Sequence, residues 1–374
     1  MRRELEQIEI PGEHVARERT WHVVESAFSE RQPVPRSSHW PRAAAIAVAL
    51  AALLAAVASP PGQAVLDEIR EVVGVERAQP ALFSLPAPGR LLVASDAGVW
   101  VVQRDGAKRL LGDYREASWS PFGRFVVAAR ENELAAVEPD GNVRWTLARR
   151  DVRFPRWTGS ETDTRVAYVD RTGIRIVAGD GSGDRLLVPR ARWPLAWRPG
   201  VAFQLAYADR RGRVVLVDAE TGRVLWRSRP DGTVVELEWS SNGRRLAARR
   251  ALAVDDVAVY TWRGALYTGF RVRRGTVTAA ATRPGSSARA VAVDGDGQSR
   301  LFVTGVPGSL LSGPGAFEDL AWSPEGQWLA VGWPAADQWV FVQDDGKRIR
   351  AVSNVSEQFR SRSFPRIEGW CCAP

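Results

Sequence analysis

Three patterns of apolar and polar residues follow one another along the chain. Between residues 13 and 31 apolar side chains recur every three or four positions, which predicts one amphipathic helix with Trp21, Val24 and Phe28 on its apolar face. Residues 43–59 carry no charge at all. Beyond residue 80 the apolar residues form short runs that are separated by turn residues, which is typical of β-strands.

The uncharged segment at residues 43–59 predicts a transmembrane helix. At 1.5 Å per residue it would span about 26 Å, close to the roughly 30 Å of a bilayer's hydrocarbon core, and Trp40 suits the membrane interface. Arg31, Arg36 and Arg42 precede the segment, whereas charges of both signs follow it. We therefore expect the N-terminus in the cytoplasm and the C-terminal part outside it. A buried helix of a soluble protein is the alternative.

This assignment divides the chain into four parts. Residues 1–42 form a cytoplasmic segment, and residues 43–59 form the transmembrane helix. Residues 60–80 form a stalk helix, which ends at Gly74, and a linker, and residues 81–372 form the outer domain. Cleavage by signal peptidase after Ala58 is the alternative to an uncleaved signal anchor. The alanine-rich membrane helix would let two copies approach closely, so a homodimer through this helix is a further hypothesis.

Two repeating signals with a period near 40 residues run through residues 81–372. The first is an anchor residue followed by a turn and a short apolar run, and its anchors are Leu85, Trp119, Trp157, Trp197, Trp239, Thr282 and Trp322. The second is a two-residue hairpin turn, found at positions 105–106, 140–141, 180–181, 221–222, 263–264, 307–308 and 345–346. Both signals count seven units.

Seven such units predict an all-β fold, a seven-bladed β-propeller, with six- and eight-bladed rings as alternatives. A four-stranded unit of this size cannot bury both of its faces alone, so the units stack radially into a ring. The sequence at 364–367 is similar to that at 154–157. We therefore expect a C-terminal strand to lie beside a first strand near Leu82–Leu85 and to latch the ring. The tryptophans beyond residue 80 are expected to pack between blades.

The repeats also carry a resemblance to known families. The W-S-P-x-G turns at 119–123 and 322–326, each followed by apolar residues, resemble the WD40-like repeat of TolB-type propellers. The stretch at 218–226 is similar to a repeat of the quinoprotein and outer-membrane-assembly propellers. The layout resembles bacterial single-pass proteins with a short inner segment and an outer propeller. The resemblance implies a protein-binding or scaffold role.

Composition excludes the commonest catalytic systems from the outer domain. All three histidines lie within the first 42 residues, and the only cysteines are Cys371 and Cys372. A Ser-His-Asp triad, a His-ligated zinc or a CxxC pair therefore cannot be assembled there. We expect a protein that is not an enzyme and has no catalytic residue and no cofactor. Cys371 and Cys372 predict a vicinal disulfide or two thiols packed beside Trp370.

Two loops and a charge excess also suggest ligands. Residues 180–184 and 294–298 place carboxylates at loop spacing, but neither matches a calcium-binding loop, so we interpret both as hairpin turns without a metal. The net charge of +8 comes from arginine, because only Lys108 and Lys347 are lysines. Runs such as 210–213 lie among acidic residues, so we interpret them as a soluble rim and expect no nucleic-acid partner. Attraction to anionic envelope polymers or lipid head groups stays open.

Two functional hypotheses from different classes follow. In the first, the chain is a non-enzymatic, membrane-anchored propeller outside the cytoplasm that binds a protein or a cell-envelope ligand, or acts as a scaffold. In the second, it is a transmembrane regulator resembling anti-sigma proteins, whose inner helix holds a cytoplasmic partner through Trp21, Val24 and Phe28. A quinoprotein-like enzyme is a further alternative. The ligand cannot be named, because propellers bind through loops and these loops carry no recognisable motif.

Overall fold

The computed structural model describes most of the predicted outer domain. The described residues are 84–372 except 159, 161–162, 192–193, 231, 252–255 and 272–274. The predicted helix at residues 13–31, the span at 43–59 and the stalk helix lie outside them. In this described part of the chain, no helix is both long enough and apolar enough to cross a membrane.

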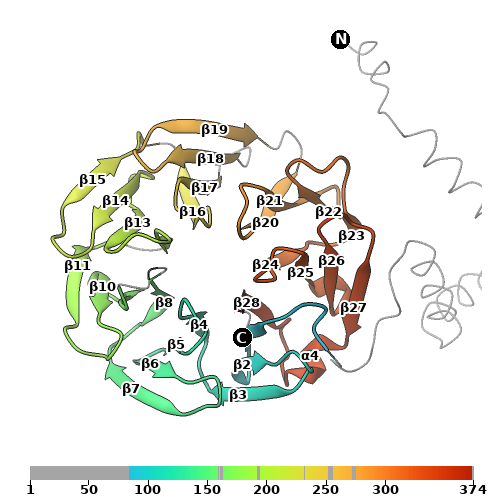
Figure 1. The fold of residues 1–374 in the computed structure, drawn as a ribbon, viewed down its shortest axis with the longest axis horizontal. Helices are drawn as coiled ribbons and strands as arrows, with labels where there is room; N and C mark the ends of the chain where they lie inside the picture. Colours follow the sequence, from blue (N-terminus) through green and yellow to red (C-terminus); the bar gives the residue numbers. More distant parts are fainter. Residues whose placement is uncertain are drawn as a thin grey trace, which may run out of the picture. The chain divides into compact units, whose positions relative to one another are not determined.

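Seven four-stranded antiparallel sheets form a ring, which confirms the all-β, seven-bladed propeller (Figure 1). From the innermost strand outwards, the first three blades are β28 (Arg366–Cys371), β1 (Arg90–Ser95), β2 (Gly98–Val102), β3 (Lys108–Gly112); β4 (Glu116–Trp119), β5 (Val126–Arg130), β6 (Glu133–Val137), β7 (Val143–Ala148); and β8 (Arg153–Trp157), β9 (Val166–Val169), β10 (Gly173–Val177), β11 (Arg185–Pro189).

The remaining blades, in the same order, are β12 (Leu195–Trp197), β13 (Gln204–Ala208), β14 (Val214–Asp218), β15 (Val224–Arg227); β16 (Thr233–Trp239), β17 (Arg245–Ala251), β18 (Asp256–Thr261), β19 (Leu266–Arg271); β20 (Thr276–Thr282), β21 (Arg289–Gly295), β22 (Gln298–Val303), β23 (Leu311–Pro314); and β24 (Glu318–Trp322), β25 (Trp328–Trp333), β26 (Gln338–Gln343), β27 (Ile349–Ser353). Two short helices, η1 (Pro334–Ala336) and α4 (Val355–Gln358), lie in connections near β26 and β27.

Both repeating signals mark fixed positions in the blades. Every predicted two-residue turn lies between the third and fourth strands of its blade. The glycine of the turn adopts a positive φ, for example 87° at Gly106 and 72° at Gly346, a region that favours glycine. The W-S-P-x-G turn joins the innermost strand to the second one, and the Ser120 hydroxyl accepts the N–H of Phe125 at 2.9 Å. Ser323 accepts the N–H of Trp328 at 3.0 Å in the same way.

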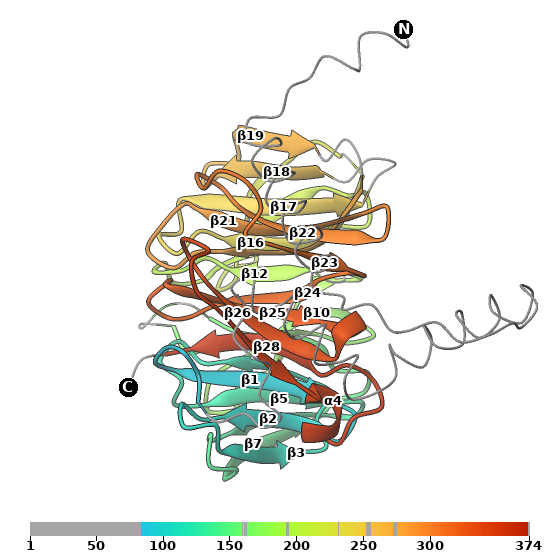
Figure 2. The same cartoon turned by 90° about the vertical axis from the view of Figure 1, so that its right-hand side faces the viewer.

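The C-terminal strand closes the ring, as predicted, but its predicted partner is wrong. Strand β28 pairs with β1 at Arg90–Ser95, not with a strand near Leu82–Leu85 (Figure 2). Ser84 and Leu85 belong to no strand, and the segment that follows contains Pro86, Pro88 and Gly89. Proline cannot donate a hydrogen bond to a sheet ladder, so this segment cannot form the first strand. The anchor of this blade is consequently Trp370 of β28.

Anchor tryptophans connect neighbouring blades. The indole N–H of Trp197 donates to the carbonyl of Arg156 at 2.9 Å, and that of Trp239 donates to the carbonyl of Ala196 at 3.2 Å. In each pair the acceptor belongs to the innermost strand of the preceding blade. The side chains are buried among apolar residues of both blades, which confirms the predicted inter-blade packing for these tryptophans.

One blade uses a polar anchor in place of tryptophan. Thr282 of β20 donates through its backbone N–H and its hydroxyl to the Glu238 carboxylate of the preceding blade, at 2.7 and 2.9 Å. Arg289 lies 2.9 Å from the same carboxylate. Burial raises the pKa of Glu238, and the Arg289 charge opposes this shift. A hydrogen-bonded cluster therefore connects these two blades, whereas Trp197, Trp239 and Trp322 connect their blades through an indole N–H.

Candidate ligand-binding site

A basic groove crosses blades 2, 3 and 4 on one face of the ring. It consists of two adjoining hollows of about 450 and 670 Å³ that share Arg171. Among the described residues, its arginines are Arg149, Arg150, Arg153, Arg171, Arg190 and Arg210, and its acidic residues are Asp151 and Asp170. Six arginines against two aspartates leave four net positive charges.

Loops from three blades bring these arginines together. Arg150 and Arg153 belong to the connection from β7 to β8 and to the start of β8, whereas Arg190 belongs to the connection from β11 to β12. Arg171 and Arg210 lie in the turns β9–β10 and β13–β14. In a four-stranded antiparallel blade, the second-to-third turn and the connection to the next blade emerge on the same face. Residues far apart in sequence therefore share one surface.

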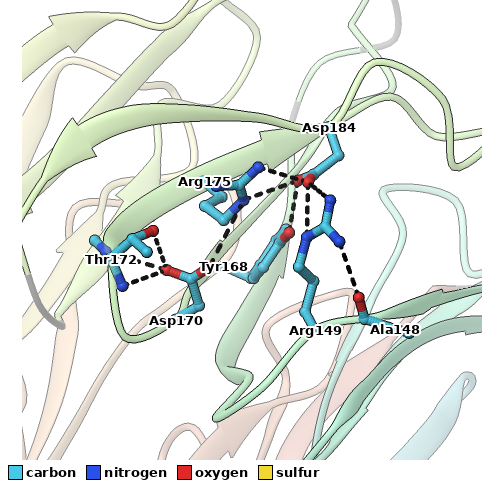
Figure 3. Close-up of polar contacts among 8 residues, drawn as sticks. Ala148, Arg149, Tyr168, Asp170, Thr172, Arg175 and Asp184 are labelled. Atoms are coloured by element: carbon cyan, nitrogen blue, oxygen red, sulfur yellow. Dashed lines mark hydrogen bonds and ion pairs between the residues drawn. The ribbon is translucent and has the colours of Figure 1, made fainter.

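A buried ionic network supports the groove from within blade 3 (Figure 3). Arg175 of β10 donates to the Asp184 carboxylate through Nη2 at 2.7 Å and Nε at 3.2 Å. Arg149, which follows β7 of the preceding blade, donates to the same carboxylate through Nε at 2.9 Å. The Tyr168 hydroxyl donates to its other oxygen at 2.5 Å. The network thus ties blade 2 to blade 3.

The network keeps Asp184 ionised and Tyr168 neutral. Only 6% of the Asp184 side chain is exposed. Burial opposes its ionisation, but the hydrogen bonds from Arg175, Tyr168 and Arg149 outweigh burial and lower its pKa. Burial and the Asp184 carboxylate raise the pKa of Tyr168, so this hydroxyl keeps its proton. Asp184 is therefore an anion that holds two guanidinium groups in place.

The network also reaches the groove lining. Arg175 lies 3.7 Å from the Asp170 carboxylate. Asp170 in turn accepts the backbone N–H of Thr172 at 2.7 Å and that of Gly173 at 3.1 Å, which fixes the turn that carries Arg171. The backbone N–H of Arg190 donates to the Thr172 carbonyl at 2.7 Å. The backbone of two groove arginines is thus fixed by hydrogen bonds.

The side chains of the groove arginines differ in their partners. Arg171 donates to Asp151, and Arg153 lies 3.9 Å from Glu116. Within the described residues, the guanidinium groups of Arg190 and Arg210 make no hydrogen bond or ion pair. A guanidinium presents a planar fork of N–H donors that matches the oxygens of a carboxylate or a phosphate. The groove can therefore bind oxyanions.

Acidic residues gather on the innermost strands instead. Burial and the nearby Glu368 charge raise the pKa of Asp319 to about 7, against the opposing charge of Arg366. The backbone N–H of Ile367 donates to Asp319 at 3.3 Å, and Arg366 lies 3.0 Å from Glu368. The first contact connects β24 to β28, and the second lies within β28. In the part of the chain that the structure describes, no group of three or more His, Cys, Asp or Glu residues could hold a metal ion.

The residues singled out by sequence lie in three places. Cys371 and Cys372 form a disulfide at the end of β28, and the Cys372 sulfur lies 3.5 Å from the carbonyl of Pro121 in blade 2. The loops at 180–184 and 294–298 lie in hairpin turns, between β10 and β11 and between β21 and β22. The predicted inner contact residues lie outside the described part; they are Trp21, Val24 and Phe28.

Comparisons with known proteins bear on the fold alone. No family model matches the chain, and no curated protein matches it. Among solved structures, it is similar to Kuenenia stuttgartiensis hydrazine synthase, with a TM-score of 0.51 and 12% identity over 62% of this chain and 76% of that chain. It is also similar to the Myceliophteria thermophila Cps50 (Swd1) β-propeller domain, with a TM-score of 0.49 and 13% identity over 64% and 86%. The fold is a β-propeller, and identities this low carry no function.

Proposed function

We propose that this chain is a non-enzymatic, membrane-anchored propeller whose outer domain binds a ligand or partner, or serves as a scaffold, outside the cytoplasm. The observation that carries the binding role is the basic groove, because loops from three blades present guanidinium groups on a rigid ring. The uncharged segment at residues 43–59 supports the anchor. The arginines before it support a cytoplasmic N-terminus.

The chemistry of the groove favours binding over catalysis. Arginine stays protonated in proteins, so it does not serve as a general base, and the groove lining includes no Ser, Cys, Lys or His among the described residues. Its two carboxylates are engaged in ion pairs, Asp151 with Arg171 and Asp170 with Arg175. The purified full-length chain should therefore carry no cofactor detectable by absorbance or mass. A bound cofactor would favour the quinoprotein-like alternative.

Topology is tested by protease protection on intact cells. We expect an external protease to degrade the propeller while residues 1–42 stay protected. Lysed cells provide the control, because both parts are then accessible. A propeller that is protected in intact cells and degraded only after lysis would overturn the proposed location.

The amphipathic pattern at residues 13–31 favours a second candidate, a transmembrane regulator of the anti-sigma type. An apolar face with Trp21, Val24 and Phe28 fits a helix that docks on a cytoplasmic partner. Affinity purification with residues 1–42 tests this role. A defined partner that is lost on Trp21→Ala and on Phe28→Ala supports regulation, whereas a segment without a partner supports a plain anchor.

A further inference from the structure

We infer that the basic groove binds an extended polyanion without nucleobases, with an oxyanion group in each of its two hollows. This inference rests on the proposed binding function and adds the chemical class of the ligand. It does not depend on the membrane anchor. The class is a chain of phosphate groups, such as a phosphate polymer or a phosphodiester-linked envelope polymer.

Charge sets this groove apart from the other hollows. The hollow beside β4 and β8, of about 610 Å³, has two arginines and two aspartates and is balanced. The hollow on β21 and β22, of about 620 Å³, has two arginines and one aspartate. The basic groove carries four net positive charges. Compared with these two hollows, the basic groove offers several anionic groups more cationic partners.

The groove is also partly assembled before a ligand arrives. Asp184 holds Arg149 and Asp151 holds Arg171, yet each guanidinium has five N–H donors and keeps some for a ligand. Arg190 and Arg210 stand in the same hollow without a side-chain partner among the described residues. Binding an oxyanion there breaks no ion pair. Because Arg149 and Arg171 are already held in place, less side-chain entropy is lost when a ligand binds.

The lining distinguishes a phosphate chain from a nucleic acid. Phe154 is the only aromatic residue among the described residues of the two hollows. Proteins that bind single-stranded nucleic acids combine a basic groove with several aromatic side chains on which the bases stack. A groove with six arginines and one aromatic ring can bind the phosphates of a nucleic-acid backbone, but it provides only one ring for base stacking. Two hollows that share Arg171 suit a chain, because one group can occupy each.

The test measures affinity for short-chain inorganic polyphosphate by titration calorimetry with the full-length chain in detergent. We expect binding that weakens as salt rises, because the contacts are ionic. The double variant Arg190→Gln with Arg210→Gln should bind at least about tenfold more weakly, since it removes two charged hydrogen-bonding groups. The thermal midpoint of this variant should not change, because neither side chain has a partner to lose among the described residues.

A matched variant provides the control. Arg104→Gln with Arg124→Gln removes the same charge from exposed arginines in turns of blades 1 and 2 on the other face of the ring. It should keep the affinity of the original chain to within about twofold, as expected for long-range electrostatics alone. An equal loss in both double variants would overturn the inference, because attraction would then follow total charge.

Further probes separate the sources of phosphate. Single-stranded DNA of matched charge should bind no more tightly than polyphosphate, and tighter DNA binding would overturn the inference in favour of a nucleic-acid site. Phosphatidylglycerol added to the detergent micelles should not compete with polyphosphate; competition would assign the groove to lipid head groups instead. No binding of polyphosphate would refute the ligand class, while the protease-protection result would still decide the proposed location.

Discussion

Replacing Asp184 with asparagine tests the network that supports the basic groove. The substitution keeps the shape of the side chain but removes the charge that Arg149 and Arg175 share. Breaking a buried ion pair from one side costs about 3–5 kcal/mol. Because 37% of the Arg149 side chain is exposed, water compensates part of its loss, so we expect the free energy of unfolding to fall by about 2–3 kcal/mol.

Urea denaturation followed by tryptophan fluorescence measures this effect, because tryptophans lie at the blade junctions. Asp180→Asn is the matched control. Asp180 occupies the same turn, but it is exposed and accepts hydrogen bonds from Ser182, at 2.9 Å from the backbone and 2.7 Å from the hydroxyl. We expect the control to lose less than about 1 kcal/mol. A loss for Asp184→Asn no larger than that of the control would refute the stabilising role.

The effect should depend on pH in one direction. The folded-state pKa of Asp184 is lowered, so its contribution is present above the unfolded value of about 3.9 and disappears as the pH falls through the folded value. The difference between the original chain and Asp184→Asn should therefore be largest near neutral pH and shrink below about pH 4. A difference that grows on acidification would contradict the assigned ionisation.

Three further predictions address other parts of the ring. Asp319→Asn should raise the thermal midpoint, and the gain should increase between about pH 4 and pH 7 and stay constant above pH 7. The reason is that the pKa of Asp319 is about 7 in the folded state and about 3.9 in the unfolded state, so its ionisation destabilises the folded state increasingly across this range. A gain that is already complete at pH 4 would contradict this. Reducing the disulfide between Cys371 and Cys372 should cost only about 1 kcal/mol in unfolding free energy, because the two residues are adjacent and the disulfide closes almost no loop; calorimetry with and without reductant tests this, and a loss above about 3 kcal/mol would oppose it. Trp322→Phe should destabilise the chain by about 1 kcal/mol more than Trp119→Phe, as measured by urea denaturation. The reason is that the Trp322 indole donates to a backbone carbonyl at 3.1 Å, whereas the buried Trp119 indole N–H has no partner among the described residues. Equal losses would remove the hydrogen bond as the cause.

The blades could be predicted because their turns are local chemistry. Asp140 and Gly141 make a tight turn whatever lies around them, since the aspartate accepts the N–H of Asn142 and glycine takes a positive φ. The repeated Trp-Ser turn likewise satisfies its own backbone. Counting these turns therefore counts the blades. The prediction needed no knowledge of tertiary contacts.

The closing strand shows where such counting fails. The pairing of β28 with β1 joins opposite ends of the outer domain. The sequence around Leu85 contains no local signal that Trp370, and not Leu85, is the anchor of this blade. The spacing offered one hint, because the first interval between anchors is the shortest of the series. A non-local pairing has to be inferred from both partners together.

The basic groove was missed for a similar reason. From sequence alone the run Arg210–Arg213 suggests a soluble rim, and the pair Arg149–Arg150 carries no prediction. Their position on the same face of the ring becomes apparent only after the turns and the connections between blades are assigned to the two faces. Asp184 was interpreted as a turn residue, and it lies in a turn, but its arginine partners come from a strand and from the preceding blade.

Ring closure by β28 has a consequence for biosynthesis. Strands β1, β2 and β3 emerge from the ribosome early, whereas the strand that completes their sheet is made nearly last. Until then the inner edge of β1 offers unpaired N–H and C=O groups to any other extended chain. A nascent chain that stalls before Arg366 would keep this edge exposed. Only when translation is complete can β28 cover the edge of β1 and prevent it from pairing with other chains.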